Sequence, residues 1–204
     1  SGQFGTVEKL KMELGTEIAA VLGFSAIKNN DKVGVIFFSD EVEKYIPPKK
    51  GKSHILRLIR ELLYFKPKNK GTSINSALDF LLKVAKRKSV VFLISDFIDS
   101  KYWKTLKMVN KKHDIIGIRL FDPSEKELPD LGLVKVLDQE TNEEFWIDTS
   151  KDADREEYKN LIDININELN SKCKKNKFDL ISISTKGDYI EPLMSYFQRR
   201  EKRV

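Results

Sequence analysis

The sequence predicts an α/β fold with one doubly wound, mostly parallel sheet and helices on both faces. Segments with helical periodicity alternate with short apolar runs along almost the whole chain. The runs Val33–Phe38 and Val90–Ser95 are apolar or small at every position, as strands buried on both faces are. Because 204 residues carry no linker and no internal repeat, we expect a single domain over 1–204.

Each element is predicted from its own pattern. Leu56 and Leu63 are expected on the core face of a helix beginning at Ser53, and Pro47-Pro48 is expected to stop the strand before it. No strand precedes the first helix, although sheets of this kind normally open with one. Helices are predicted over 6–29, 53–63, 74–85, 103–110, 154–175 and 189–200, strands over 33–38, 42–46, 90–95, 115–120 and 178–184, and one antiparallel hairpin over 133–137 and 144–147 with its turn at 138–142.

Composition limits the classes of function. The net charge of +6 permits nucleic-acid contact, but the basic residues are spread along the chain rather than clustered. No apolar run reaches the length of about 20 residues that a membrane span needs. The single Cys173 excludes an internal disulfide and falls in the apolar series of a helix, so a buried thiol in a reducing, cytoplasmic compartment is expected.

Several catalytic and nucleotide motifs are excluded. Gly51-Lys52-Ser53 follows a strand, but Ile46 stands where a phosphate-binding loop needs glycine, and Pro47-Pro48 stiffens the loop. Neither histidine has a partner at metal or triad spacing. His54 is predicted to be a solvated helix residue, and His113 a turn residue.

Three oxygen-bearing residues remain as candidates: Ser1, Thr72 before a helix, and Asp96 after the strand Val90–Ser95. Hydroxyls and carboxylates are the ligands that Mg²⁺ prefers. The same residue types are common helix N-caps, so Asp96 could instead cap the next helix. Residue types alone favour the caps, because spacing does not bring the three residues together.

A family resemblance favours the metal site. Gly71-Thr72 and Ser95-Asp96 resemble the second and third parts of the metal-ion-dependent adhesion site (MIDAS) of von Willebrand factor type A domains, and Ser1 stands like the last serine of its Asp-x-Ser-x-Ser loop. The chain most resembles a bacterial branch, the domain-of-unknown-function family fifty-eight, whose members accompany MoxR-type AAA ATPases. The matching segments are 31–34 with 38–40, 93–97, 121–123 with 127–133, 146–150, 184–185 and 188–193.

The resemblance implies a Rossmann-like, von Willebrand factor A-like domain that lacks its first strand. That strand would lie between Val33–Phe38 and Val90–Ser95, so these two strands should either close up or keep open edges that invite self-association. It further implies a non-catalytic, protein-binding role in which Ser1, Thr72 and Asp96 help to hold Mg²⁺ in the intact protein. The implied partner is a MoxR-type ATPase or its substrate, in chaperone-like complex assembly.

Two other classes of function stay open at this point. Asp40, Asp96 and Asp99 could surround a cation in a metal-assisted hydrolase, although no general base is obviously placed. The positive charge could instead serve a basic nucleic-acid-binding domain.

Overall fold

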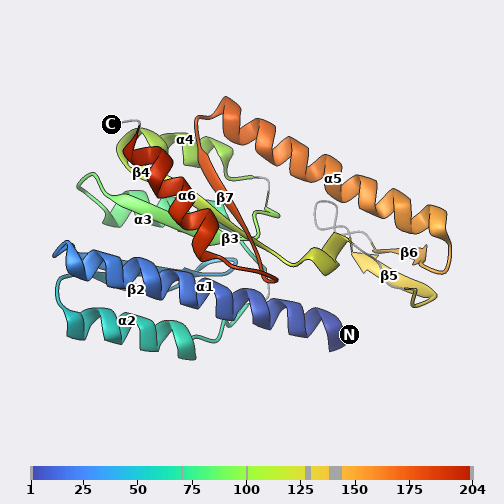
Figure 1. Cartoon of the computed structure of the whole chain (residues 1–204), viewed down its shortest axis with the longest axis horizontal. Coiled ribbons are helices and arrows are strands. Elements are labelled where there is room, and N and C mark those ends of the chain that lie inside the picture. Colours follow the sequence, from blue (N-terminus) through green and yellow to red (C-terminus); the bar gives the residue numbers. More distant parts are fainter. Residues whose placement is uncertain (1, 70, 100, 127–129, 138–143, 203–204) are drawn as a thin grey trace.

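The computed structural model describes residues 2–69, 71–99, 101–126, 130–137 and 144–202. It is a mixed α/β structure, drawn in Figure 1. In chain order its elements are α1 (Gly2–Lys28), β1 (Val33–Phe38), β2 (Val42–Lys49), α2 (Lys52–Tyr64), α3 (Ile74–Val84), β3 (Val90–Ser95), α4 (Trp103–Lys112), β4 (Asp114–Phe121), the 3-10 turn η1 (Pro123–Lys126), β5 (Leu133–Leu137), β6 (Glu144–Asp148), α5 (Asp152–Lys175), β7 (Asp179–Ser184) and α6 (Ile190–Glu201).

The strands form one parallel sheet and two antiparallel pairs, whereas one mostly parallel sheet and one antiparallel hairpin were predicted. β3, β4 and β7 make a parallel sheet in that order, with Val90 opposite Asp114 and Ile116 opposite Asp179. β1 and β2 form an antiparallel pair, and β5 and β6 form another. The predicted hairpin is therefore confirmed, while its turn at 138–142 lies outside the described residues.

Helices cover both faces of the parallel sheet. On one face, Leu93 and Ile115 pack with α3, α4 and the end of α5, where Cys173 is buried as expected. On the other face, Ile116, Ile118 and Ile181 pack with α1 and α6. Side chains alternate between the faces of a strand, so β4 contributes to both clusters. Gly117 is required on the first face, because a Cβ there would lie 2.6 Å from the Phe178 ring.

The β1–β2 pair has its own small core. Phe37 and Ile46 pack there against Ile55 and Leu58 of α2, which lies beside α1 (Figure 1). The β5–β6 hairpin lies near the N-terminal half of α5, away from the parallel sheet in the same view. Among the helices of the described residues, none combines the length and the apolarity that crossing a bilayer demands.

β1 and β3 each have an edge without a strand partner within the described residues. β1 bonds only to β2, β3 bonds only to β4, and the two strands have not closed up against each other. Their apolar sequences are also poorly covered: only Phe37 in β1 and Leu93 in β3 are fully buried, whereas β4 buries most of its residues. Val90 is 60% exposed, which is unusual for a strand of this composition.

Three predictions need correction. β2 continues through Pro47 and Pro48, because it is an edge strand that tolerates missing backbone donors. Leu56 and Leu63 are exposed, since the face of α2 that packs on β1 and β2 is narrower than its apolar stripe. His54 is half-buried, with its Nε2 2.9 Å from the carbonyl oxygen of Val33. The prediction for His113 is confirmed: it lies in the turn between α4 and β4, as the C-cap of α4, and its side chain is buried.

Candidate functional site

The candidate site is the C-terminal edge, defined here as the ends of β1, β3, β4 and β7 with their loops, residues 39–40, 71–73, 95–99, 121–125 and 184–186. Ligands of parallel α/β sheets bind at such edges, because the strands end there together. The sequence predicted Thr72 and Asp96 on two of these loops. Ser1, the third predicted ligand, lies outside the described residues.

The N-terminus of α3 joins the ends of β1 and β3. The Ser73 amide donates to the carbonyl oxygen of Ser39, just after β1, at 2.7 Å. The next amide, that of Ile74, donates to the Asp99 carboxylate, just after β3, at 2.9 Å. The loop carrying Thr72 is therefore hydrogen-bonded to both strand ends.

Gly71 lets this loop approach Asp40. A Cβ at residue 71 would lie 1.8 Å from Oδ1 of Asp40, so no other residue type fits without displacing that carboxylate. The close approach fixes the start of the loop and leaves Thr72 exposed beside it. Within the described part of the chain, the Thr72 hydroxyl has no hydrogen-bond partner.

Asp96 stabilises its own turn. Its Oδ1 accepts from the Ser95 hydroxyl and from the Ile98 amide, each at 3.3 Å. The turn is anchored by Phe97, which has a left-handed φ of 60° and a buried ring packed against Tyr102 and Phe178. Because the next helix, α4, has Tyr102 as its N-cap, the alternative that Asp96 caps that helix is wrong. Oδ2 of Asp96 accepts no hydrogen bond from any described residue.

The three carboxylates of the hydrolase alternative have separate structural roles. Asp40 packs on Gly71, Asp96 closes its turn, and Asp99 binds the α3 terminus as well as the Lys101 amide at 2.9 Å. Among the described residues, no group of three or more His, Cys, Asp or Glu side chains is arranged to hold a metal ion. Within the part of the chain that the structure describes, these three carboxylates thus do not form the cluster that metal-assisted hydrolysis uses.

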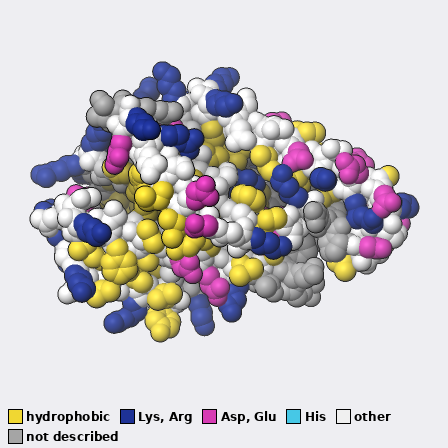
Figure 2. Space-filling model, viewed as in Figure 1, with side chains coloured by type: hydrophobic (Ala, Val, Ile, Leu, Met, Phe, Trp, Pro, Cys, Tyr) yellow, Lys and Arg dark blue, Asp and Glu magenta, His cyan; other side chains and the backbone are white. Residues whose placement is uncertain are grey.

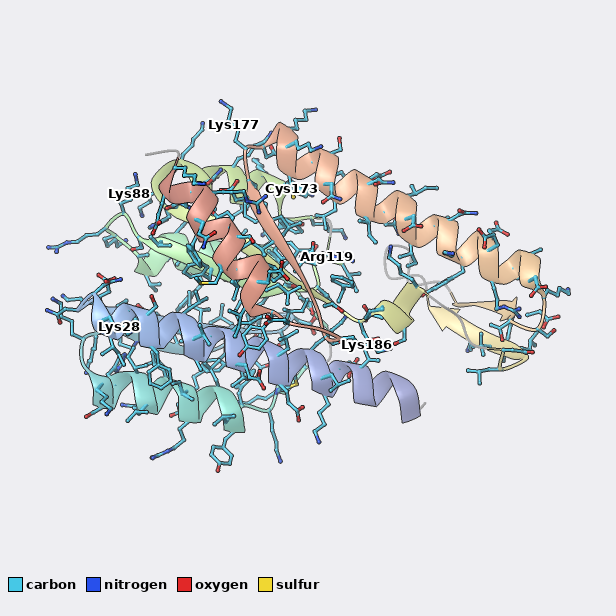
Figure 3. All side chains as sticks on the ribbon, in the orientation of Figure 1. Lys28, Lys88, Arg119, Cys173, Lys177 and Lys186 are labelled. Atoms are coloured by element: carbon cyan, nitrogen blue, oxygen red, sulfur yellow. The ribbon has the colours of Figure 1, made fainter. Side chains whose placement is uncertain are left out.

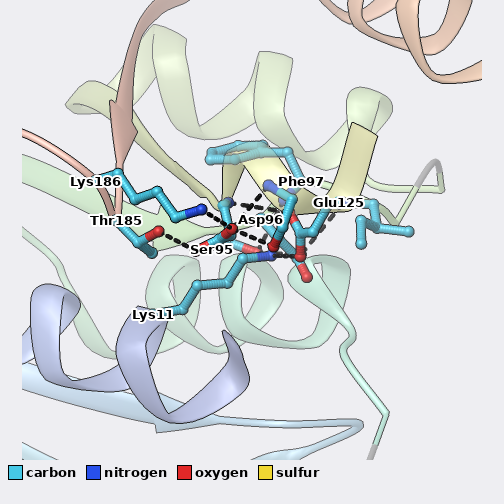
Figure 4. Close-up of polar contacts among 10 residues, drawn as sticks. Lys11, Ser95, Asp96, Phe97, Glu125, Thr185 and Lys186 are labelled. Atoms are coloured by element: carbon cyan, nitrogen blue, oxygen red, sulfur yellow. Dashed lines mark hydrogen bonds and ion pairs between the residues drawn. The ribbon is translucent and has the colours of Figure 1, made fainter. Parts of the chain in front are cut away.

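Basic side chains lie next to Asp96. Arg119, on β4, is half-buried, with its guanidinium carbon 5.2 Å from the centre of the Phe121 ring (Figure 3). Burial lowers the pKa of Arg119, and the nearby carboxylates of Glu125 and Asp96 partly oppose that effect. Lys11 reaches from α1 to pair with Glu125, as Figure 4 shows. The site thus has cations of its own on the β4 side of Asp96.

Asp122 is the most buried carboxylate of the edge. Its oxygens accept hydrogen bonds from the Ser124 amide at 2.8 Å and from the hydroxyls of Ser124 and Thr185, and Lys186 lies 3.9 Å away (Figure 4). Burial raises the pKa of Asp122, but these hydrogen bonds outweigh burial and keep the pKa below its usual value. Asp122 therefore links the ends of β4 and β7.

Sequence reasoning missed the roles of Asp122, Arg119 and Lys11. For Asp122 a signal existed: an acidic residue directly after β4, with Ser124 two residues on and Thr185 directly after β7. For Arg119 and Lys11 we find none, because a lone cation in an apolar strand or on a helix does not identify its partner.

The family comparison decides the relationship. The model of the family described as "Protein of unknown function DUF58" matches residues 1–165. The chain belongs to this family. That assignment agrees with the resemblance noted from the sequence, and it carries no activity, because the family is defined without one.

Relatives of this DUF58 chain are found among mycobacterial proteins. The uncharacterized protein Rv1480 of Mycobacterium tuberculosis is 27% identical over 150 residues, which is 71% of this chain and 47% of the relative. The uncharacterized protein MAV169 of Mycobacterium avium is 36% identical over 76 residues, 36% of this chain and 45% of that protein. The chain spans about half the length of the curated relatives it matches.

A solved structure shares the fold. The conserved hypothetical protein BatB from Bacteroides thetaiotaomicron superposes with a TM-score of 0.56, covering 95% of this chain and 89% of BatB. With a sequence identity of 14%, the likeness concerns the fold alone.

Proposed function

We propose that this DUF58 chain is a non-catalytic protein-interaction domain that binds its partner through the C-terminal edge. One observation carries the proposal. Thr72 and Asp96 lie on two loops joined at the α3 terminus, and the Thr72 hydroxyl and Oδ2 of Asp96 accept no hydrogen bond from the described residues. Oxygen atoms without a hydrogen-bond partner on two adjoining loops are suited to binding an external ligand such as a metal ion.

The metal of the proposal is Mg²⁺, as in a MIDAS. The hydroxyl of Thr72 and the carboxylate of Asp96 fit Mg²⁺ in chemical type, since hard cations take oxygen ligands and keep several waters. Further ligands would come from Ser1, from other parts of the protein and from water. When bound, the ion would supply an open coordination position for a carboxylate of the partner, while Thr72 and Asp96 would orient it.

The partner we propose is a MoxR-type AAA ATPase or its substrate, in a chaperone-like assembly role in the cytoplasm. Family resemblance supports this choice. A protein partner also agrees with the chemistry of the site, because an exposed hydroxyl, a half-buried carboxylate and a cation suit recognition of a carboxylate side chain better than catalysis, which would need a cluster of acids with a base.

We further propose that residues 1–204 form a single von Willebrand factor A-like domain that lacks its first strand, and that with this strand the domain has one doubly wound sheet. β1 and β3 both end beside the N-terminus of α3, as parallel strands of one sheet would. One further strand parallel to both would join the order β2-β1 to β3-β4-β7. Without that strand, the two open edges offer a route to self-association.

The test measures binding of the purified MoxR-type ATPase from the same organism to the protein that contains this chain, with Mg²⁺ and with EDTA. We expect binding with Mg²⁺, loss of at least tenfold in affinity with EDTA, and a similar loss for Asp96→Ala. Glu168→Ala, an exposed acid on α5, is the matched control and should bind normally. Binding that ignores both EDTA and Asp96→Ala would contradict the metal-dependent proposal.

A further inference from the structure

The outward face of α2 exposes large apolar side chains that the fold does not use. Leu63 is 65% exposed and Tyr64 is 78% exposed. Leu56, about two turns earlier in the same helix, is also exposed. On the adjoining helix, Val21 and Phe24 are also exposed. Figure 2 shows hydrophobic side chains gathered over α1 and α2 on this side of the molecule. We call the three exposed residues of α2, Leu56, Leu63 and Tyr64, the α2 patch.

The α2 patch rests on a firmly packed helix. Ile55 and Leu58, on the opposite face of α2, are buried against β1 and β2. Gly23 brings α1 close, since a Cβ there would lie 3.2 Å from the Ile55 side chain. The helix is thus held by its inner face, and its outer apolar residues are free to contact a second surface.

Several basic residues share the exposed side of α2 with the α2 patch, although Figure 2 also shows acidic side chains beside the hydrophobic ones. α2 carries Lys52, Arg57 and Arg60 on its exposed side, and Lys28 lies in the last turn of α1 (Figure 3). Within the described residues, none of these four forms an ion pair. The only acid of α2, Glu61, pairs with Lys44 of β2 and also attracts Arg57 and Arg60, so it offsets only part of the positive charge of this helix.

We propose that the α2 patch is a peripheral membrane-binding surface that takes the headgroups of anionic phospholipids. Amphipathic helices that combine exposed apolar residues with Lys and Arg bind at the headgroup boundary of a bilayer. Arg57, Arg60 and Lys52 meet lipid phosphates, while Leu63 and the Tyr64 ring enter the interface. Tyrosine favours that depth, because its ring is apolar and its hydroxyl stays hydrated.

Charge complementarity selects a lipid surface over a second copy of this chain. A symmetric dimer places the same patch of both copies face to face, so the basic residues of both copies would be brought close together and would repel. An anionic bilayer neutralises them instead. Each basic residue near the surface then contributes about 1 kcal/mol of favourable binding free energy. The inference does not depend on the C-terminal edge or on any metal.

The experiment is flotation of the chain with phosphatidylcholine vesicles, with and without phosphatidylglycerol. We expect binding only to the anionic vesicles and release by high salt, because exposed charges are screened. Arg57→Glu with Arg60→Glu should weaken binding by about 30-fold or more. Leu63→Ser with Tyr64→Ser should weaken it by at least about tenfold through lost apolar burial.

The control variants make the same changes in charge and in apolar content on α5, away from the α2 patch. Lys159→Glu with Lys174→Glu, and Leu161→Ser with Ile164→Ser, change exposed residues of α5 and should leave vesicle binding unchanged. Circular dichroism verifies that each variant is folded. No binding of the unmodified chain to anionic vesicles, equal binding to neutral ones, or an equal loss in the α5 variants would overturn the proposal.

Discussion

At the scale of single residues, Asp96 and Asp122 follow neighbouring strands and have different environments. Asp122 is buried and bonded on both oxygens, whereas Asp96 is half-buried and uses one oxygen to close its turn. The Asp122 carboxylate is therefore structural, whereas the Asp96 carboxylate keeps one oxygen available for a ligand. The sequence alone showed only that both follow strands, because the number of donors around a carboxylate depends on loops distant in the chain.

Thr185→Val should destabilise the fold through Asp122. Removing the hydroxyl leaves one buried carboxylate oxygen without its donor, at a cost of about 1–3 kcal/mol in the free energy of unfolding. Because the folded pKa of Asp122 is lowered, its contribution is present above the unfolded pKa of about 3.9 and is lost as the pH falls through the folded value. Urea unfolding at neutral pH measures the cost. Thr185→Ser keeps the hydroxyl and should cost much less, and equal costs would contradict the role of this bond.

His113 should make the fold sensitive to mild acid. Burial lowers its pKa, with Lys112 adding to the effect, and neither ring nitrogen has a partner within the described residues. Above about pH 6.5 the ring is neutral in both states and no penalty arises. As the pH falls from there towards the lower folded pKa, the unfolded chain takes up the proton first, so stability decreases. Thermal unfolding across this range should show the decrease in the unmodified chain and in His54→Gln, but not in His113→Leu.

At the scale of elements, continuous apolar runs predicted β1 and β3 with their observed bounds, Val33–Phe38 and Val90–Ser95. Periodicity predicted the helices to within a few residues. It overestimated the buried face of α2, because a pattern does not reveal how wide a surface packs on it. The pairing of the β5–β6 hairpin was predictable from its short connection, but the separation of β1 and β2 from the parallel sheet was not, since the neighbour of a strand edge is not encoded in the strand itself.

Gly71→Ala tests the loop that carries Thr72. The added Cβ would meet the Asp40 carboxylate at 1.8 Å, so this exposed side chain must turn away, and we expect a small loss of about 0.5–1 kcal/mol in unfolding free energy. Asp40→Ala in the same chain removes the clash and should restore most of that loss. A double-mutant cycle by urea denaturation measures the coupling, and simple additivity of the two changes would disprove the close approach.

Backbone amide exchange tests the open edges of β1 and β3. β4 has a strand on each side, so its amides should exchange most slowly, whereas the outward-facing amides of β1 and β3 should exchange much faster. Exchange followed by mass spectrometry or NMR at low protein concentration gives the comparison. If the amides slow as concentration rises, the edges associate between copies. Uniform protection of β1, β3 and β4 even at the lowest concentration would contradict the three-sheet arrangement.

At the scale of the whole molecule, the sheets, helices and charge place two surfaces on different parts of the fold. The C-terminal edge carries Thr72 and Asp96 where β1 and β3 end, and the α2 patch lies on the outer side of the β1–β2 core. A domain with both surfaces can hold a protein partner while resting on a lipid surface. The family is shown by comparison, and the two surfaces are our proposals about what its members do.

The most direct test of the central claim is calorimetric titration of Mg²⁺ into the protein that contains this chain, compared with its Thr72→Ala and Asp96→Ala variants. We predict a saturable heat of binding that Asp96→Ala abolishes and that Thr72→Ala weakens by about tenfold, as loss of one oxygen ligand should. Glu168→Ala, remote from the edge, should titrate like the unmodified protein. Absence of heat, or the same heat in all four proteins, would contradict a metal-dependent binding site at the C-terminal edge.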